Sequence, residues 1–142
     1  MDFVTFGIAK KLKEKGFTCE LPFAMYNEIG QFCLLTTSAP YNVCDSGYKC
    51  REYYDYEDFD EFDYIAPTIS QVLKWLREEK NIYIISQPFA SMDTTDKVVW
   101  GWHWKHNSDG EFIDVTYSDE TSYISYEEAS VAGINYALDN VI

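Results

Sequence analysis

The part of this chain best suited to recognising charge is the acidic segment Glu52–Tyr64, which reads EYYDYEDFDEFDY. Each of its thirteen residues is acidic or aromatic, and its seven acids supply more than half of the net charge of −13. Acids and aromatic residues both recur every three positions. That period matches a polyproline II or 3₁₀ conformation better than a strand or an α-helix. We expect Tyr53, Tyr56, Phe59 and Phe62 to point inward while the carboxylates face water.

These carboxylates can offer an anionic strip to a basic protein surface. Duplex DNA carries about one charge per 1.7 Å of its axis, and the acidic segment approaches a comparable linear density. A strip of this kind can occupy a nucleic-acid-binding groove and block it. The alternative is an acidic loop that only keeps the surface solvated. The residues expected to contact a partner are Glu52, Asp55, Glu57, Asp58, Asp60, Glu61 and Asp63.

The spacing of the candidate metal ligands differs from that of known metal-binding motifs. Asp58–Asp63 resembles the start of an EF-hand loop, but Phe62 occupies the third ligand position and the required glycine is missing. The four cysteines include no Cys-x-x-Cys pair, so we expect thiols in a reducing cytosol. A zinc ion shared among them is an alternative. These cysteines are Cys19, Cys33, Cys44 and Cys50. We expect no metal and no cofactor.

A second unusual segment, Lys97–Lys105, reads KVVWGWHWK and alternates as a strand does. Its rings share one face: Trp100, Trp102 and Trp104. If exposed, they would form a stacking platform, but the small residues of the final helix favour a buried core. The alternative function is a small-ligand binder or an enzyme with a pocket near these rings and His103. Asp114 or a cysteine would be the expected partner of His103 there.

The chain lacks a recognisable catalytic motif. Its two histidines, His103 and His106, are three positions apart, which places them on opposite faces of a strand. Neither a Gly-x-Ser-x-Gly elbow nor a glycine-rich phosphate loop is present. We therefore expect a protein that is not an enzyme, although a His–Cys or His–Asp pair assembled in space stays an alternative.

The charge balance restricts the classes of partner. A net charge of −13 argues against direct nucleic-acid binding and against anionic membranes. The sequence has no run of about 18 apolar residues and no signal-peptide pattern, so we expect a cytoplasmic protein without a membrane partner. A homo-oligomer with a structural role, joined through its aromatic face, is a further alternative.

Helix boundaries are well marked. A helix is expected over Thr5–Lys15, with Thr5 as its N-cap and Gly16 as its C′ residue. A second follows the N-cap Thr68 and ends before Asn81, and a third follows Ser125 in a capping box.

Alternating and β-branched runs indicate five strands. Their ranges are 23–26, 31–36, 82–87, 97–105 and 111–117. The predicted order is α-β-β-(acidic loop)-α-β-β-β-α. The expected fold class is α+β, with one antiparallel sheet of about five strands packed against two to three helices. We expect a single domain over residues 1–142, with the acidic segment as an insertion.

Three segments carry a resemblance to other proteins: AKKLKEKGF, PTISQVLKWLREEKNIYI and SYEEASVAGINYAL. They resemble a group of small uncharacterised proteins of bacteriophages and of prophages in gut bacteria. The shared pattern consists of helix caps and amphipathic faces, and the acidic segment lies outside it. The resemblance implies no catalytic residues.

The resemblance and the charge together predict a non-enzymatic phage or prophage accessory protein. We expect it to bind a basic protein surface through its acidic residues. One form of this hypothesis is a nucleic-acid-mimicking inhibitor of a host defence protein or nucleic-acid-binding protein.

Overall fold

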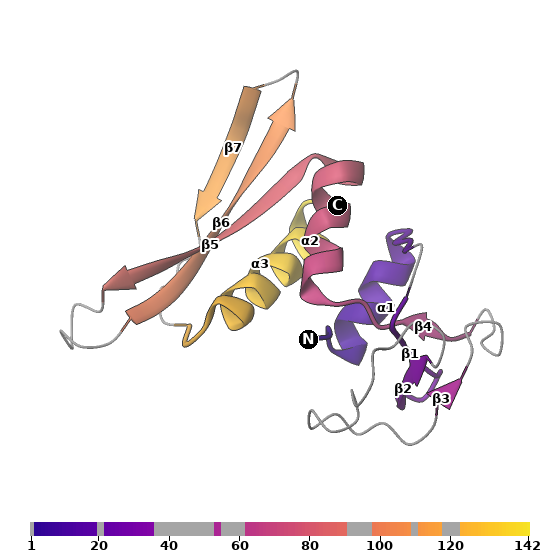
Figure 1. Cartoon of the computed structure of the whole chain (residues 1–142). Helices are drawn as coiled ribbons and strands as arrows, with labels where there is room; N and C mark the ends of the chain where they lie inside the picture. Colours follow the sequence, from indigo (N-terminus) through magenta and orange to yellow (C-terminus); the bar gives the residue numbers. More distant parts are fainter. Residues whose placement is uncertain are drawn as a thin grey trace. The chain divides into compact units, whose positions relative to one another are not determined.

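The computed structural model describes residues 2–19, 22–35, 53–54, 62–90, 98–108, 111–117 and 123–142. The described helices and strands confirm the predicted α+β class (Figure 1). The chain divides into two compact units, Met1–Thr68 and Ile69–Ile142. The expectation of one domain over residues 1–142 stays a prediction.

The first unit opens with helix α1, Phe6–Glu14, one residue inside the predicted limits at each end. The side chain of Thr5 caps it by accepting a hydrogen bond from the amide of Ile8 at 3.4 Å. Gly16 ends it with a φ of +80°, and the amide of Phe17 then donates to the carbonyl of Leu12 at 2.9 Å. The predicted caps are therefore confirmed.

The first unit also contains a four-stranded sheet in the order β3-β2-β1-β4. The hairpin of β1 (Ala24–Tyr26) and β2 (Phe32–Leu35) is the predicted one. Strand β3 (Tyr53–Tyr54) runs parallel to β2, and β4 (Tyr64–Ile65) runs antiparallel to β1. Both short strands fall inside the acidic segment or at its end, where the sequence predicts an insertion without strands.

The core of this sheet is small and is bordered by rings. Ala24, Leu34 and Ala66 are fully buried, and Phe3, Tyr26 and Phe32 pack against them. The hydroxyl group of Tyr26 donates to the carbonyl of Val4 at 2.7 Å, which ties the chain before α1 to β1. The aromatic pairs bury apolar area and hold their geometry through edge-on contacts.

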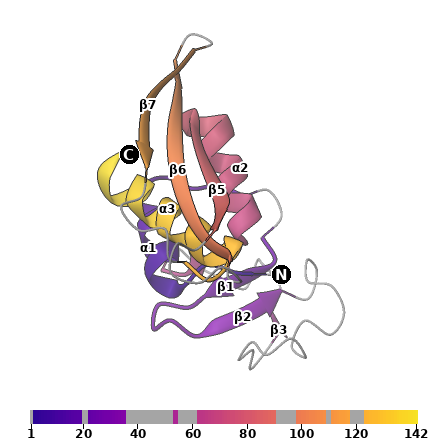
Figure 2. The same cartoon turned by 90° about the vertical axis from the view of Figure 1, so that its left-hand side faces the viewer.

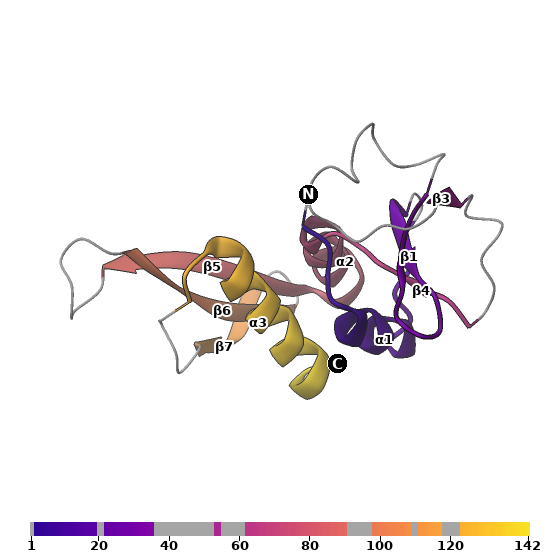
Figure 3. The ribbon, with the colours of Figure 1, turned by 90° about the horizontal axis from the view of Figure 1, so that it is seen from below.

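The second unit packs two helices on a three-stranded antiparallel sheet in the order β5-β6-β7. Figure 2 shows α2 and α3 on the same side of this sheet, and Figure 3 shows α3 lying along β5 and β6. The elements are α2 (Ile69–Lys80), β5 (Ile82–Ala90), β6 (Val98–Ser108), β7 (Glu111–Tyr117) and α3 (Tyr126–Asn140). Helix α2 ends before Asn81, as predicted, and Asn81 has the φ of +57° that is typical of a C′ residue.

Two strands extend beyond their predicted ends. Strand β5 continues through Pro88, which pairs with Trp100, because β5 lies at the sheet edge and an edge strand tolerates a residue without an amide hydrogen. Strand β6 continues from the predicted Lys105 to Ser108, where it pairs with Glu111. Only two residues join β6 to β7, Asp109 and Gly110, and Asp-Gly is a favoured hairpin sequence.

Helix α3 approaches the sheet closely through its small residues. The hydroxyl oxygens of Ser86 on β5 and Ser130 on α3 lie 2.8 Å apart. At Gly133, a Cβ atom would meet Cγ2 of Ile84 at 2.6 Å, so only glycine fits this position without a shift. The predicted small-residue flank of the final helix thus brings it against β5 and β6.

The strands form two sheets, whereas the sequence predicts one sheet of about five strands. Each strand pairs with a partner from its own unit. Strand β4 pairs with the open edge of β1, and β5 pairs with β6 through a local antiparallel connection. The parallel pair of β2 and β3 also departs from the fully antiparallel expectation.

Candidate functional site

The acidic segment is attached to the sheet of the first unit at both ends. At its start, Tyr53 and Tyr54 pair with Leu34 and Leu35 of β2. At its end, Tyr64 pairs with Tyr26, and the next residue, Ile65, pairs with β1 as well. Backbone pairing at both ends limits the positions that the intervening carboxylates can reach.

The two attachment points lie on opposite edges of the four-stranded sheet. Three strand spacings of about 4.8 Å separate the edges by roughly 14 Å. The nine residues from 55 to 63 must connect these edges, and an extended chain of that length spans about 30 Å. Most of the predicted contact acids lie in this connection, so the sheet determines where their chain begins and ends.

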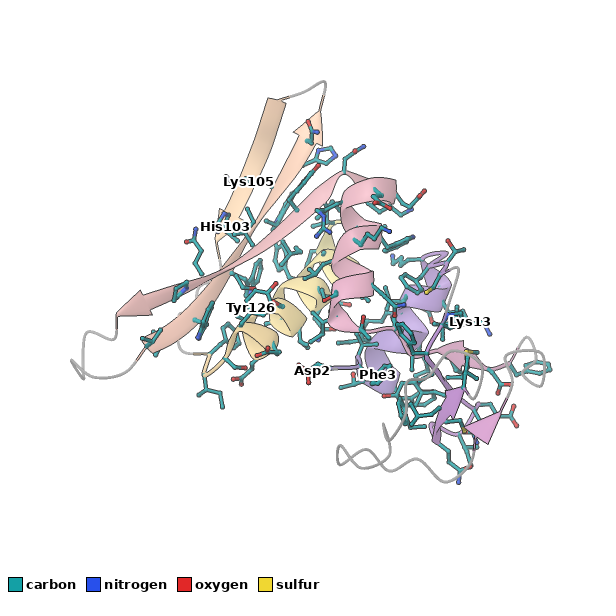
Figure 4. All side chains as sticks on the ribbon, in the orientation of Figure 1. Asp2, Phe3, Lys13, His103, Lys105 and Tyr126 are labelled. Carbon is teal, nitrogen blue, oxygen red and sulfur yellow. The ribbon has the colours of Figure 1, made fainter. Side chains whose placement is uncertain are left out.

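Helix α1 contacts the end of the acidic segment through Lys13. Its Nζ atom donates to the backbone carbonyl of Asp63 at 2.8 Å and lies 4.8 Å from the ring centroid of Tyr64. The ring of Phe6 meets the same tyrosine edge-on, with centroids 5.4 Å apart. Figure 4 shows Lys13 on the side of α1 that faces β4. The lysine-rich end of α1 therefore helps to fix the point at which the acidic segment joins the sheet.

The expected arrangement of rings is wrong at Phe62. This side chain is 59% exposed, whereas the period of three predicts that it points inward. The ring that is half-buried and packed is Tyr64, two positions later, because it belongs to β4 and lies between Phe6 and Lys13. Tyr56 and Phe59 lie outside the described residues, as does the side chain of Tyr53.

Of the seven predicted contact acids, the structure describes only Asp63. This residue is half-buried, next to Tyr64. Glu52, Asp55, Glu57, Asp58, Asp60 and Glu61 lie outside the described residues. The structure thus gives the attachment points of the acidic segment and the position of its last carboxylate.

The tryptophan face of β6 belongs to the core of the second unit. Trp102 and Trp104 are 7% and 8% exposed, and the ring centroid of Trp102 lies 5.0 Å from that of Tyr136 on α3. Trp100 lies nearer the start of β6 and is half-buried. Its ring meets that of Tyr126 edge-on, with centroids 5.8 Å apart. Helix α3 therefore occupies the space in which a ligand would stack on Trp102 and Trp104.

His103 lies on the opposite face of β6 from these rings. It pairs with Ile85 of β5 and Tyr117 of β7, and its side chain is only 5% exposed. Burial is the main cause that lowers its pKa below the ordinary 6.5, and the positive charge of Lys105 lowers it further. Figure 4 shows both side chains on β6. Asp114 lies on β7, and its side chain is outside the description.

The stability of the second unit should therefore fall when His103 is protonated. In the unfolded chain its pKa is near 6.5, above the folded value. Below about pH 6.5 the unfolded state binds more protons, so the free energy of unfolding decreases as the pH drops through the folded pKa. Urea unfolding between about pH 7.5 and pH 5.5 measures this decrease.

The same measurement on two variants separates this histidine from other groups. In His103→Gln, the free energy of unfolding should decrease less over this pH range than in the unsubstituted chain. In His106→Gln, the decrease that is due to His103 should remain. If His103→Gln has the same pH dependence as the unsubstituted chain, burial of the neutral imidazole is not the cause.

No three His, Cys, Asp or Glu side chains are placed to hold a metal ion within the described ranges. Cys33 is buried, with its Sγ 3.8 Å from the carbonyl oxygen of Gln31, whereas Cys44 and Cys50 are outside those ranges. Among the helices of the described residues, none has the length and apolar character needed to cross a bilayer.

The chain matches no family model, no curated protein sequence and no solved structure in comparisons with each.

The sequence did not single out a group of exposed apolar side chains in the second unit. Val98, Ile124 and Tyr126 are 60%, 83% and 43% exposed. One signal was available. Tyr126 lies three, four and seven positions before Ala129, Ser130 and Gly133, so it shares their face of the helix at the first turn.

Proposed function

We propose that this chain is a non-enzymatic accessory protein that binds a basic protein surface through the acidic segment. Its contact residues are the seven carboxylates between positions 52 and 63. A partner that normally binds nucleic acid suits this charge, so inhibition by nucleic-acid mimicry is the mechanism we favour. The resemblance to phage and prophage proteins favours an inhibitor that is encoded by a mobile element and acts on a host protein.

The observation that carries this proposal is the attachment of a strongly acidic segment at both ends. An untethered chain of like charges loses conformational entropy when it binds, and this loss reduces its affinity. Pairing with β2 and with β1 has already ordered the two ends of this segment. Less entropy therefore remains to be lost on binding, while the density of carboxylates is retained.

The contact of Lys13 supports the same mechanism. Its Nζ atom donates to the backbone carbonyl of Asp63. A basic residue thus fixes the end of the acidic segment through the backbone.

The test removes the charge of the segment without changing its length. A sixfold variant replaces the acids that precede Asp63 by their amides: Glu52→Gln, Asp55→Asn, Glu57→Gln, Asp58→Asn, Asp60→Asn and Glu61→Gln. Pull-downs from a bacterial lysate, quantified by mass spectrometry, should recover a basic partner with the unsubstituted chain. The variant should recover at least about tenfold less, because long-range attraction and close ion pairs are both lost.

A matched variant controls for net charge alone. It neutralises six exposed acids elsewhere: Asp2→Asn, Glu14→Gln, Glu28→Gln, Glu78→Gln, Glu79→Gln and Asp139→Asn. This control should retain the partner. Recovery should also fall between about 0.1 M and 1 M salt, where the Debye length shortens from about 10 Å to about 3 Å. Equal losses in the two variants, or recovery independent of salt, would contradict a role for the acidic segment.

A further inference from the structure

The second unit exposes an apolar patch where β6 extends beyond helix α3. We define this patch as Val98, Trp100, Ile124 and Tyr126. Trp100 is its centre: its backbone is bridged to Tyr123, the residue before Ile124, and its ring meets that of Tyr126 at 5.8 Å. Val98 lies two positions before Trp100 and so shares its side of the strand. Figure 4 shows Tyr126 at the start of α3, beside the end of β6.

The packing of α3 explains why this patch is uncovered. The helix covers the same face of β6 at Trp102 and Trp104, but its first residue is Tyr126. The strand begins farther out, at Val98, which is 60% exposed. The apolar face of β6 therefore runs past the helix that covers it. Tyr and Trp at an exposed apolar surface are the residue types that anchor protein interfaces.

The charge beside the patch is negative. Among the described residues 123–128 there are two acids, Glu127 and Glu128, and no base. The carboxylate of Glu128 is placed directly beside the patch, since its Oε2 atom accepts a hydrogen bond from the amide of Ile124 at 2.9 Å. Glu127 is exposed next to Tyr126.

These observations specify the chemistry of the occupant. We propose that the patch binds a short basic segment of a partner protein, with one or two aliphatic or aromatic anchors on the patch and flanking Lys or Arg near the acids. Four side chains expose on the order of a few hundred Å², below the roughly 800 Å² per partner of a stable interface between folded proteins. A peptide segment fits that area.

The same charge disfavours the other occupants. A second copy of the chain would also carry −13, and its patch would bring the same acids into contact. An anionic membrane would be repelled for the same reason. This inference does not rest on the function proposed above, because it concerns a different surface in a different unit.

The test uses three synthetic peptides of equal length as probes. One combines Lys with two Leu residues, one combines Lys with Ser, and one combines Glu with Leu. Methyl-labelled NMR spectra of the full chain report the binding site. The Lys/Leu peptide should shift the Val98 and Ile124 methyl signals and bind at least about tenfold more tightly than either other peptide, because it alone supplies both anchors and charge.

Two variants make the assignment specific. Ile124→Ser should weaken the Lys/Leu peptide by about tenfold, as expected for the loss of an exposed apolar anchor. Ile29→Ser is the matched control, since Ile29 is 72% exposed in the first unit, and it should leave binding unchanged. The sixfold amide variant of the acidic segment should bind the Lys/Leu peptide with unchanged affinity. This test can therefore succeed or fail independently of the proposed function.

Several results would overturn the inference. These are shifts confined to the methyl signals of Ile65, next to the acidic segment, equal binding of the Glu/Leu peptide, or no effect of Ile124→Ser. If the chain alone sediments as a dimer, and Ile124→Ser dissociates this dimer, the occupant of the patch is a second copy of the chain. Shifts of the patch signals with neutral phosphatidylcholine vesicles, but with none of the peptides, would identify a lipid surface.

Discussion

Replacing Gly30 by alanine is expected to lower the free energy of unfolding of the first unit by about 2–4 kcal/mol. Gly30 ends the turn between β1 and β2 with a φ of +87°, a conformation that is strained for residues with a Cβ atom. An added Cβ would also lie 2.8 Å from Cδ1 of Phe6. Both effects oppose the substitution, so their costs add.

Hydrogen exchange is the suitable measurement, because all four tryptophans lie in the second unit and report little on the first. Amides in β1 and β2, such as that of Leu35, which donates to the carbonyl of Phe23 at 3.0 Å, should exchange faster in Gly30→Ala. The amides of α3 should keep their exchange rates, provided that the two units open separately.

Gly16→Ala is the matched control. Gly16 has a similar φ of +80°, but nothing lies within 4 Å of the position that a Cβ would take. This variant should incur only the backbone strain, about 1–2 kcal/mol. Equal losses in the two variants would mean that Phe6 moves aside at little cost and that its contact with Gly30 is unimportant.

The position of Phe6 connects this prediction with the proposed function. Its ring lies 5.4 Å from that of Tyr26 on β1 and 5.4 Å from that of Tyr64 on β4. A displaced Phe6 would therefore loosen the end of the acidic segment as well as the turn. If the attachment of the segment matters for recognition, Gly30→Ala should also weaken partner binding, although it removes no charge.

The helices of this chain could be predicted because their signals are local. Thr5 and Ser125 accept hydrogen bonds from amides three residues later, and Gly16 and Asn81 adopt the positive φ that ends a helix. Each of these interactions joins residues close in the sequence. A single sequence contains the whole interaction, so the prediction needs no knowledge of the rest of the fold.

The pairing of the acidic segment could not be predicted, because it depends on distant residues. Tyr53 forms β3 only because Leu34 presents an open strand edge, and Tyr64 is packed only because Phe6 and Lys13 lie beside it. A period of three gives no account of such contacts, which is why it placed Phe62 in the interior. The predicted end of the strand at position 87, before Pro88, is wrong for a similar reason, since a proline is tolerated only at an edge position that the sheet order defines.

Gly133→Ala should destabilise the second unit by about 1–2 kcal/mol, although alanine favours helices over glycine by about 1 kcal/mol. The new Cβ would lie 2.6 Å from Cγ2 of Ile84 and 3.4 Å from two ring atoms of Trp102. The Cγ2 methyl is attached directly to the branched Cβ of Ile84, so it cannot rotate away without changing a stiff χ1 angle. Helix α3 must therefore move outward or the core must be strained.

Urea unfolding followed by tryptophan fluorescence measures this effect, since Trp102 lies at the contact itself. Gly7→Ala in α1 is the matched control, followed by hydrogen exchange of the α1 amides: a Cβ there would meet only Oγ1 of Thr5 at 4.0 Å, so alanine should stabilise α1 by about 0.5 kcal/mol. The double variant Gly133→Ala, Ile84→Leu removes the Cγ2 methyl while keeping the volume, and it should recover most of the loss. If Gly133→Ala stabilises the chain as Gly7→Ala does, α3 does not approach β5 as closely as the structure places it, and the small residues of this helix have another cause.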